Sequence, residues 1–261
     1  MSIGLIIIGD EIMSGKRADQ HFPRVIDMLK ARGLHLDWAE YLGDEPTRII
    51  ATLTRTFASG DIVFCCGGIG ATPDDHTRQC AAAALGVPLV LHSDARAKIQ
   101  ERISDMAQKA GWAAEFDSPD NVRRLKMGEF PHGAQIIPNP VNKIPGFSVD
   151  THYFVPGFPE MAAPMIEWAL DTYHSSLFHQ EQWLEKSALV FDALEASLTP
   201  LMEAIESRFP LVKIFSLPHI GGSTSRSFIE LGVKGDPVQV DEAFGILLAA
   251  LDARKMEYLM S

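Results

Sequence analysis

The sequence has little cysteine and no long apolar run. Among its 261 residues are three cysteines, Cys65, Cys66 and Cys80. So small and odd a number in a chain of this size indicates a reducing compartment rather than a disulfide framework. No stretch approaches the roughly 18 apolar residues that a membrane-spanning helix needs, and no basic leader precedes the first apolar run. We therefore expect a cytoplasmic protein that has no membrane partner.

Basic residues are also scarce. The chain has 23 Lys and Arg against 34 Asp and Glu, which gives a net charge of −11. A protein that coats nucleic acid needs a basic face, so no nucleic-acid partner is expected. An acidic protein that binds an anionic substrate would recruit metal ions to it.

Several familiar site motifs are missing. A glycine string begins at Gly67 and Gly68, but counting on from Gly68 and Gly70 the third glycine of a G-x-G-x-x-G fingerprint would fall at Pro73. There is no phosphate loop of the type G-x-x-x-x-G-K-[ST], no H-x-x-x-H metal pair and no G-x-S-x-G nucleophile turn. These absences disfavour a classical dinucleotide dehydrogenase, a P-loop NTPase and a serine hydrolase.

Strand-like and helical patterns alternate over the first two-thirds of the chain. Continuous apolar runs at 3–8 and 62–66 are typical of strands covered on both faces, and amphipathic runs at 23–32, 46–57, 77–85, 94–110 and 160–173 predict helices. The stretch 116–147 is looser and rich in Pro, Asn and Gly. The pattern predicts an α/β domain over 1–173 with a mostly parallel sheet between helices. A polar linker over 174–183 and a small α+β domain over 184–261 follow.

Glycine is followed by acid where four predicted strands end. These ends contain Gly9-Asp10-Glu11, Gly43-Asp44-Glu45, the loop from Gly67 to Asp74-Asp75, and Gly157 with Glu160. In a parallel sheet such ends share one edge, where ligands bind. Glycine amides and the next helix N-terminus would hold phosphate, with hydroxyls from Thr72 and Thr77. The carboxylates suit a divalent cation between protein and phosphate. Acidic residues at the start of a helix also cap it favourably, whatever the function of the protein. For Asp44-Glu45 this capping role is the favoured interpretation.

The sequence resembles the MoaB/Mog molybdopterin-binding-like superfamily, and most closely the N-terminal region of the CinA family. The resemblance covers about residues 3–173, and its motifs occur in the family's order. They are IGDEIMSG (8–15), GD (43–44), GGIGATPDDHTR (67–78), IPNP (137–140), PGF (145–147) and PGFPEM (156–161).

The resemblance implies a three-layer α/β sandwich that binds a pterin- or nucleotide-containing phosphate. It implies catalytic roles for Asp44 and Asp75, and a divalent metal ion, Mg²⁺ by expectation, at Asp10, Glu11, Asp74 and Asp75. The residues implied to bind the ligand are Gly9, Gly67, Gly68, Gly70, Thr72, Thr77, Asn139, Gly157 and Glu160. Because relatives form dimers or trimers, a homo-oligomer is expected.

Two functions remain open. The leading hypothesis is a metal-dependent nucleotide pyrophosphatase that cleaves a dinucleotide such as ADP-ribose or FAD. The alternative is a molybdopterin-binding protein of molybdenum cofactor biosynthesis, with or without adenylyl transfer. The chain departs from the family pattern at 17–21, where RADQH replaces the usual asparagines. The C-terminal part resembles a small KH-like domain, but its loop at 219–223 is not the GXXG of an RNA-binding module.

Overall fold

The computed structural model describes residues 2–180, 184–222 and 226–261. The chain divides into two compact units, of which the first ends at Phe178 and the second begins at His179. This boundary falls within the predicted linker 174–183, whose last three residues lie outside the described residues, as does residue 223 of the loop at 219–223. Each unit is built around its own hydrophobic core.

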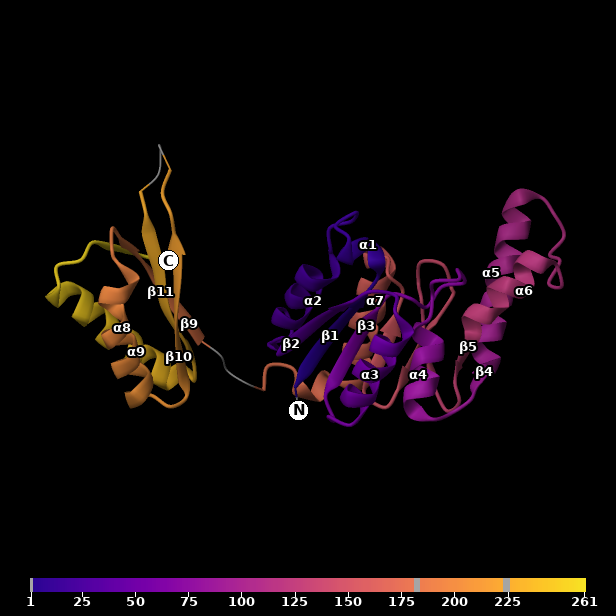
Figure 1. Cartoon of the computed structure of the whole chain (residues 1–261), viewed down its shortest axis with the longest axis horizontal. Helices are drawn as coiled ribbons and strands as arrows, with labels where there is room; N and C mark the ends of the chain where they lie inside the picture. Colours follow the sequence, from indigo (N-terminus) through magenta and orange to yellow (C-terminus); the bar gives the residue numbers. More distant parts are fainter. Residues whose placement is uncertain (1, 181–183, 223–225) are drawn as a thin grey trace. The chain divides into compact units, whose positions relative to one another are not determined.

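The first unit contains a six-stranded sheet in the order β2-β1-β3-β8-β7-β6 (Figure 1). Strands β2, β1, β3 and β8 run parallel, whereas β7 and β6 form antiparallel pairs at one end. The mostly parallel sheet confirms the predicted fold class. The bounds are β1 Ile3–Ile8, β2 Trp38–Leu42, β3 Ile62–Cys66, β6 Gln135–Ile137, β7 Gly146–Val149 and β8 His152–Val155.

Helices cover both faces of this sheet, which makes three layers. The α2 and α7 side chains pack with Leu5 and Phe64 on one face, and those of α3 and α4 pack with Ile6 and Cys65 on the other. Every residue of β1 and β3 is buried, as the continuous apolar runs predict. The helices are α1 Asp10–Met13, α2 His21–Lys30, α3 Pro46–Phe57, α4 Thr77–Leu85, α5 Ser93–Ala110, α6 Pro119–Leu125 and α7 Pro159–Tyr173.

The stretch 116–147, expected to be loose, holds more structure than its composition suggests. It contains α6, a 3₁₀ turn η1 at Lys126–Gly128, β6 and the first half of β7. It also supplies β5, Glu129–Pro131, which pairs antiparallel with β4, Leu89–Leu91. Strands of three or four residues are too short to show periodicity, so only pairing with their neighbours defines them.

The second unit is a small α+β domain. Its antiparallel sheet has the order β10-β11-β9-β12, and α8 and α9 pack side chains such as Leu198, Ile205 and Leu247 into a single core with it. Its elements are β9 Leu184–Phe191, α8 Glu195–Arg208, β10 Val212–His219, β11 Phe228–Gly235, α9 Pro237–Ala253 and β12 Tyr258–Met260.

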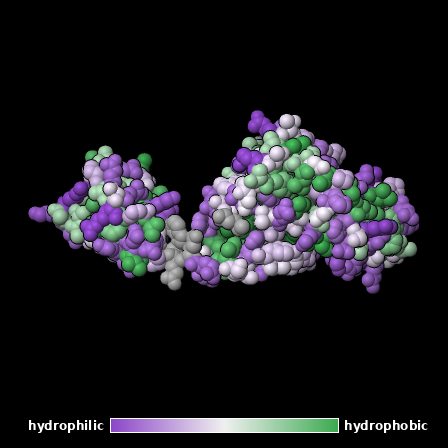
Figure 2. Space-filling view, turned by 90° about the horizontal axis from the view of Figure 1, so that it is seen from below, coloured by the Kyte–Doolittle hydropathy of each residue, from purple (hydrophilic) through white to green (hydrophobic). Residues whose placement is uncertain are grey.

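The surface of both units is mixed rather than uniformly polar. Figure 2 shows hydrophobic residues at the surface among hydrophilic ones, and the exposed apolar side chains include Trp112 and Ile220. Among the described residues, no helix combines the length and the hydrophobicity needed to cross a bilayer.

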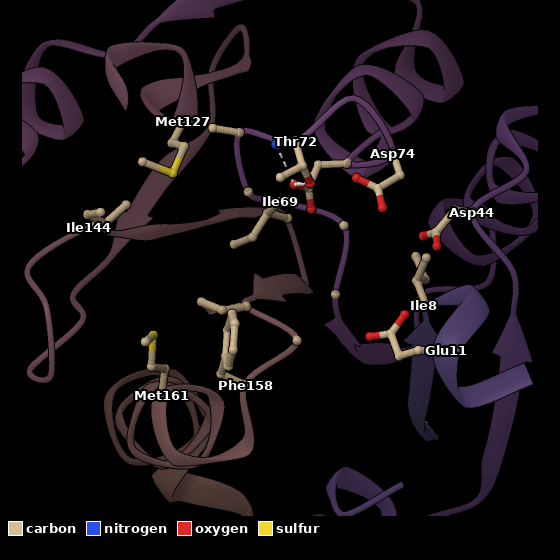
Figure 3. Close-up of a pocket in the computed structure, with 18 of the residues that line it drawn as sticks. Ile8, Glu11, Asp44, Ile69, Thr72, Asp74, Met127, Ile144, Phe158 and Met161 are labelled. Atoms are coloured by element: carbon tan, nitrogen blue, oxygen red, sulfur yellow. Dashed lines mark hydrogen bonds between the residues drawn. The ribbon is translucent and has the colours of Figure 1, made fainter. Parts of the chain in front are cut away.

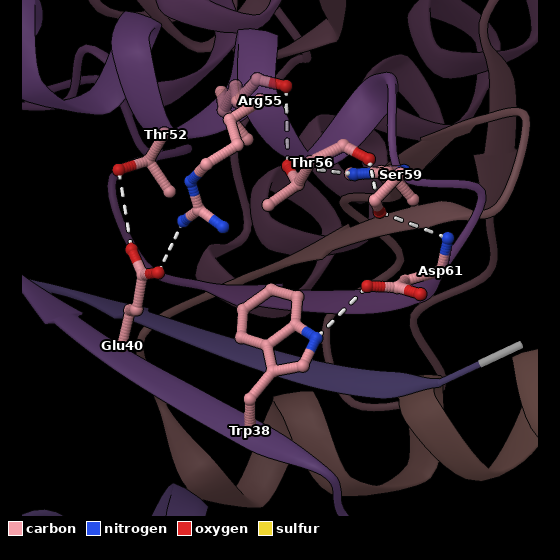
Figure 4. A network of polar contacts seen from close by, with 9 residues as sticks. Trp38, Glu40, Thr52, Arg55, Thr56, Ser59 and Asp61 are labelled. Atoms are coloured by element: carbon pink, nitrogen blue, oxygen red, sulfur yellow. Dashed lines mark hydrogen bonds and ion pairs between the residues drawn. The ribbon is translucent and has the colours of Figure 1, made fainter.

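A polar network ties β2 to α3 near the edge of the sheet where the parallel strands begin (Figure 4). The Trp38 indole donates to Asp61 at 3.1 Å, and Arg55 pairs with Glu40. The backbone amide of Asp61 in turn donates to the Ser59 hydroxyl at 3.1 Å. These contacts join the strand, the helix and the loop before β3, so this edge stabilises the unit while the opposite edge is left for a ligand.

His152, at the start of β8, is expected to make the stability of this unit depend on pH. Its Nε2 lies 3.0 Å from the Thr56 hydroxyl, and its ring packs 4.3 Å from that of Phe57. Burial lowers the pKa of His152 to about 4, below the 6.5 of an unfolded histidine. Between these values only the unfolded chain binds the proton, so the free energy of unfolding falls as pH falls, by up to about 1.4 kcal/mol per pH unit.

Urea denaturation at pH 7.5 and pH 5 tests this dependence. We expect wild type to lose more stability over this interval than His152→Gln, which keeps a hydrogen-bonding group near Thr56 but does not titrate. Equal losses in the two proteins would show that His152 contributes nothing to the pH dependence.

Candidate functional site

Four turns meet at the edge of the sheet where β1, β2, β3 and β8 end. They enclose a cavity of about 390 Å³, called here the main cavity. This volume lies within the range of small-molecule sites. The predicted site residues that line it are Gly9, Glu11, Asp44, Gly67, Gly68, Gly70, Thr72, Asp74, Asp75 and Gly157. The common edge expected from the strand order is therefore present.

The main cavity has two chemically different sides (Figure 3). Glu11, Asp44 and Asp74 lie on one side. Ile69 and Thr72, from the loop after β3, lie between the two. The other side is apolar, and its labelled residues are Met127, Ile144, Phe158 and Met161. Such a site can hold charged and planar apolar parts of one ligand at once.

The loop after β3, residues 67–76, is shaped by glycines. Gly67 has φ +114°, and a Cβ atom there would lie 2.1 Å from the Ile8 carbonyl oxygen. Gly68 has φ +67°, and a Cβ atom there would lie 2.2 Å from the Thr77 hydroxyl. Both positions therefore require glycine. The Thr77 hydroxyl donates to the Gly67 carbonyl at 3.0 Å and is buried. It therefore holds the loop in place, whereas we expected it to face the ligand.

Asp75 and Arg78 fix the same loop from two sides. The Thr72 amide donates to Asp75 Oδ2 at 2.8 Å, and the Thr72 hydroxyl does so at 2.5 Å. The guanidinium of Arg78, which is 3% exposed, donates to the Gly70 carbonyl at 2.6 Å and to that of Lys126. Sequence reasoning assigned no role to Arg78. Because it joins the loop to η1, it ties the middle of the cavity to the apolar side.

Asp10 and Asp44 hold two of the turns together. The Asp10 amide donates to Asp44 Oδ2 at 2.9 Å, and the Asp44 amide donates to Asp10 Oδ1 at 3.1 Å. Asp10 does not line the main cavity. Instead of pointing at a ligand, one of its carboxylate oxygens satisfies the Asp44 backbone. Its position therefore serves to orient Asp44.

The acids of the cavity differ in how readily they lose a proton. Burial raises the pKa of Asp44, and the nearby charges of Asp10, Glu11 and Asp74 also raise it, against a hydrogen bond from the Asp10 amide. A hydrogen bond with Thr72 lowers the pKa of Asp74. When the environments of two nearby carboxyl groups move their pKa values in opposite directions, the two groups typically take different roles in acid–base catalysis. Asp74 is the group that stays charged, and Asp44 is the one better suited to accept a proton.

The acids do not form a ready-made metal cage. Within residues 2–180, 184–222 and 226–261, no three His, Cys, Asp or Glu side chains are grouped to hold a metal ion among themselves. Mg²⁺ commonly keeps several waters and uses one or two carboxylates together with substrate phosphates. Two carboxylates of the main cavity, those of Glu11 and Asp74, would suit that mode, in which the ligand itself completes the coordination.

Asn139 and Glu160 lie away from the main cavity. The Asn139 side-chain oxygen accepts from the Val141 amide at 3.0 Å, so it shapes its own turn; this residue lines a separate hollow of about 270 Å³. Glu160 pairs with Arg24 at 3.3 Å and lines a neighbouring hollow of about 400 Å³.

The structure adds residues that sequence reasoning did not assign to the site. Met127 and Ile144 come from the stretch 116–147, where no periodicity marked them. Phe158 and Met161 lie inside a quoted motif but were given no role. Arg17, noted only as a departure from the family pattern, also lines the main cavity.

Comparison with known proteins gives the family. Residues 4–174 match the model described as a probable molybdopterin binding domain. A CinA-like protein of Anaeromyxobacter sp. (strain K) is 34% identical over 175 residues, which are 65% of this chain and 40% of that protein. A CinA-like protein of Mycobacterium tuberculosis (strain ATCC 25177 / H37Ra) is 28% identical over 246 residues, which are 90% of this chain and 55% of that protein. The chain thus spans about half the length of these relatives.

A solved structure supports the same placement. The protein CinA from Thermoplasma acidophilum, described as having unknown function, matches with a TM-score of 0.54 and 26% identity, over 65% of this chain and 95% of that one. The fold, the motifs and the family model agree with one another. The chain belongs to the molybdopterin-binding domain family over residues 4–174, and its resemblance to CinA-like proteins is confirmed.

Proposed function

We propose that the first unit is a metal-dependent nucleotide pyrophosphatase that cleaves a dinucleotide such as ADP-ribose or FAD. The observation that carries this proposal is the division of the main cavity, with carboxylates on one side, an apolar surface on the other and the loop 67–76 between them. A dinucleotide has the matching parts, namely a charged diphosphate and a planar ring system.

The loop supplies donors for the phosphates. Among the described residues, the amides of Gly68, Gly70 and Ala71 donate to no protein acceptor. The loop leads into α4, so the positive end of that helix dipole lies at the end of the loop. Unpaired amides around glycine are a typical anion site, so we place the diphosphate here.

The carboxylates suit the cation that such a substrate needs. Glu11 and Asp74 would hold a divalent ion together with the diphosphate, which matches the one or two carboxylates that Mg²⁺ uses beside substrate phosphates. That ion would neutralise phosphate charge and make water more acidic. Asp44 would then take a proton from the attacking water, and the oxygen atom of that water would bond to one phosphorus. The bond from that phosphorus to the bridging oxygen breaks, and the products are AMP and a second phosphate monoester.

The alternative function also has support. The family model is that of a probable molybdopterin binding domain, and the apolar side formed by Met127, Ile144, Phe158 and Met161 would accommodate a pterin ring. In that case the loop 67–76 holds the phosphate of the pterin, and no diphosphate is cleaved. Adenylyl transfer would further require ATP.

A substrate panel separates the two functions. The full chain is incubated with ADP-ribose, FAD or NAD and Mg²⁺, and AMP is followed by chromatography. We expect AMP from ADP-ribose or FAD, and loss of this release when EDTA removes the metal. Tight pterin binding without AMP from any of the three would replace the proposal by the alternative.

A further inference from the structure

A second hollow adjoins the main cavity. This side compartment, of about 400 Å³, shares part of its wall with the main cavity. The shared residues are Ile8, Glu11, Arg17, Gly157 and Phe158. Because the same side chains line both spaces, the two spaces meet at these residues.

Arg17 is the cation at this junction. It is exposed, and it is the only Lys or Arg among the described residues that line either space. Its side chain forms no ion pair with the part of the chain that the structure describes, whereas the nearby Arg24 is paired with Glu160 at 3.3 Å. Its backbone amide donates to the Glu11 carbonyl at 3.0 Å, which fixes where the side chain starts. An unpaired guanidinium there is available for a phosphate.

The side compartment itself suits a nucleoside better than a second charged group. Ile7 and Ile12 line it together with Gln20, His21 and Glu160. Burial lowers the pKa of His21, which also hydrogen-bonds the Gly157 backbone, so the imidazole is neutral at pH 7. A nucleoside can contact all of these groups. Its base can pack on the apolar wall, and its polar atoms can bond to the amide, the imidazole and the carboxylate.

Arg24 holds the polar edge of this compartment in place. It contacts Gln20 at 3.2 Å and Glu160 at 3.3 Å, which joins the starts of α2 and α7. The compartment is therefore an organised part of the fold.

We propose that the side compartment binds one end of a two-ended diphosphate, and that Arg17 contacts the diphosphate where the ligand passes from the main cavity. This inference rests on the proposed function and adds to it a binding place for one end of the substrate. The site then selects molecules with a nucleoside or sugar at each end of a diphosphate over nucleoside monophosphates, because only the former span the junction.

Calorimetry with two probes tests this inference. The α,β-methylene analogue of ADP-ribose is the two-ended probe, AMP is the one-ended probe, and both are titrated with Mg²⁺ present. Arg17→Gln is expected to weaken binding of the analogue by about 10- to 100-fold and that of AMP by less than about 3-fold. Lys16→Gln removes the same charge one residue away, where the side chain lines neither space, and should leave both affinities within about 3-fold.

Ala18→Phe provides an independent variant. Ala18 is exposed and lines only the side compartment, so a ring there should fill this space without unfolding the chain and should weaken binding of the analogue alone. Equal losses for the two probes in Arg17→Gln, or an unchanged analogue affinity in both variants, would overturn the inference but not the proposed function. Failure of wild type to bind either probe would overturn both.

Discussion

Replacing Asp44 with Asn is expected to lower kcat for dinucleotide cleavage by about 10²- to 10⁴-fold, the usual contribution of a general base. The amide oxygen of Asn can still accept from the Asp10 amide, so the turn should keep its shape. Burial raises the pKa of Asp44, and a base must be deprotonated to act, so wild-type activity should fall as pH falls through that pKa. The variant should lack this acidic limb. Steady-state AMP release between pH 4 and 8 measures both effects.

Glu45→Gln is the matched control for Asp44→Asn. It removes the same charge at the next residue, where the side chain caps α3 by accepting from the Thr47 and Arg48 amides and does not line the main cavity. Its activity should stay within about 3-fold of wild type, with at most about 1 kcal/mol of lost stability. If Glu45→Gln lost as much activity as Asp44→Asn, a general effect of acidic charge would replace the base assignment.

Gly67→Ala is expected to destabilise the first unit by at least about 3 kcal/mol and to abolish ligand binding. A residue with a side chain is strained at φ +114°, which costs of order 1 to 3 kcal/mol. The added Cβ also meets the Ile8 carbonyl oxygen at 2.1 Å. Because Gly67 donates from its amide to the Val155 carbonyl at 3.0 Å, the chain is held between two strands and cannot move aside. Urea denaturation and calorimetry measure the two losses.

Gly60→Ala separates the cost of backbone strain from the cost of a steric clash. Gly60 has φ +74°, and a Cβ atom there meets nothing within 4 Å. This variant should lose only about 1 kcal/mol and keep full ligand binding. Equal destabilisation of the two variants would mean that the contact with Ile8 is unimportant and that the loop tolerates side chains.

The sequence predicts those parts of the fold that have a strong local pattern. Continuous apolar runs identified β1 and β3 because burial on both faces removes every polar position. Gly86, with φ +67°, ends α4 as expected of a helix followed by glycine. The strands β6 and β7 were not predicted, since three or four residues carry no periodicity and these strands are defined only by their pairing with neighbouring strands.

The site was predictable in position but not in side-chain direction. Parallel strands end at one edge, so the turns at Gly9, Asp44, Gly67 and Gly157 could be brought together from their order alone. Which way each polar group turns depends on the nearest unsatisfied backbone atom, and a sequence does not give that. Asp10 and Asn139 both turn to backbone amides.

A crystal structure with the α,β-methylene analogue of ADP-ribose and Mn²⁺ tests the central claim most directly. We expect the diphosphate on the amides of Gly68, Gly70 and Ala71, and anomalous Mn²⁺ signal beside Glu11 and Asp74. A main cavity that stays empty at saturating analogue, or an analogue whose diphosphate lies away from the loop 67–76, would contradict it.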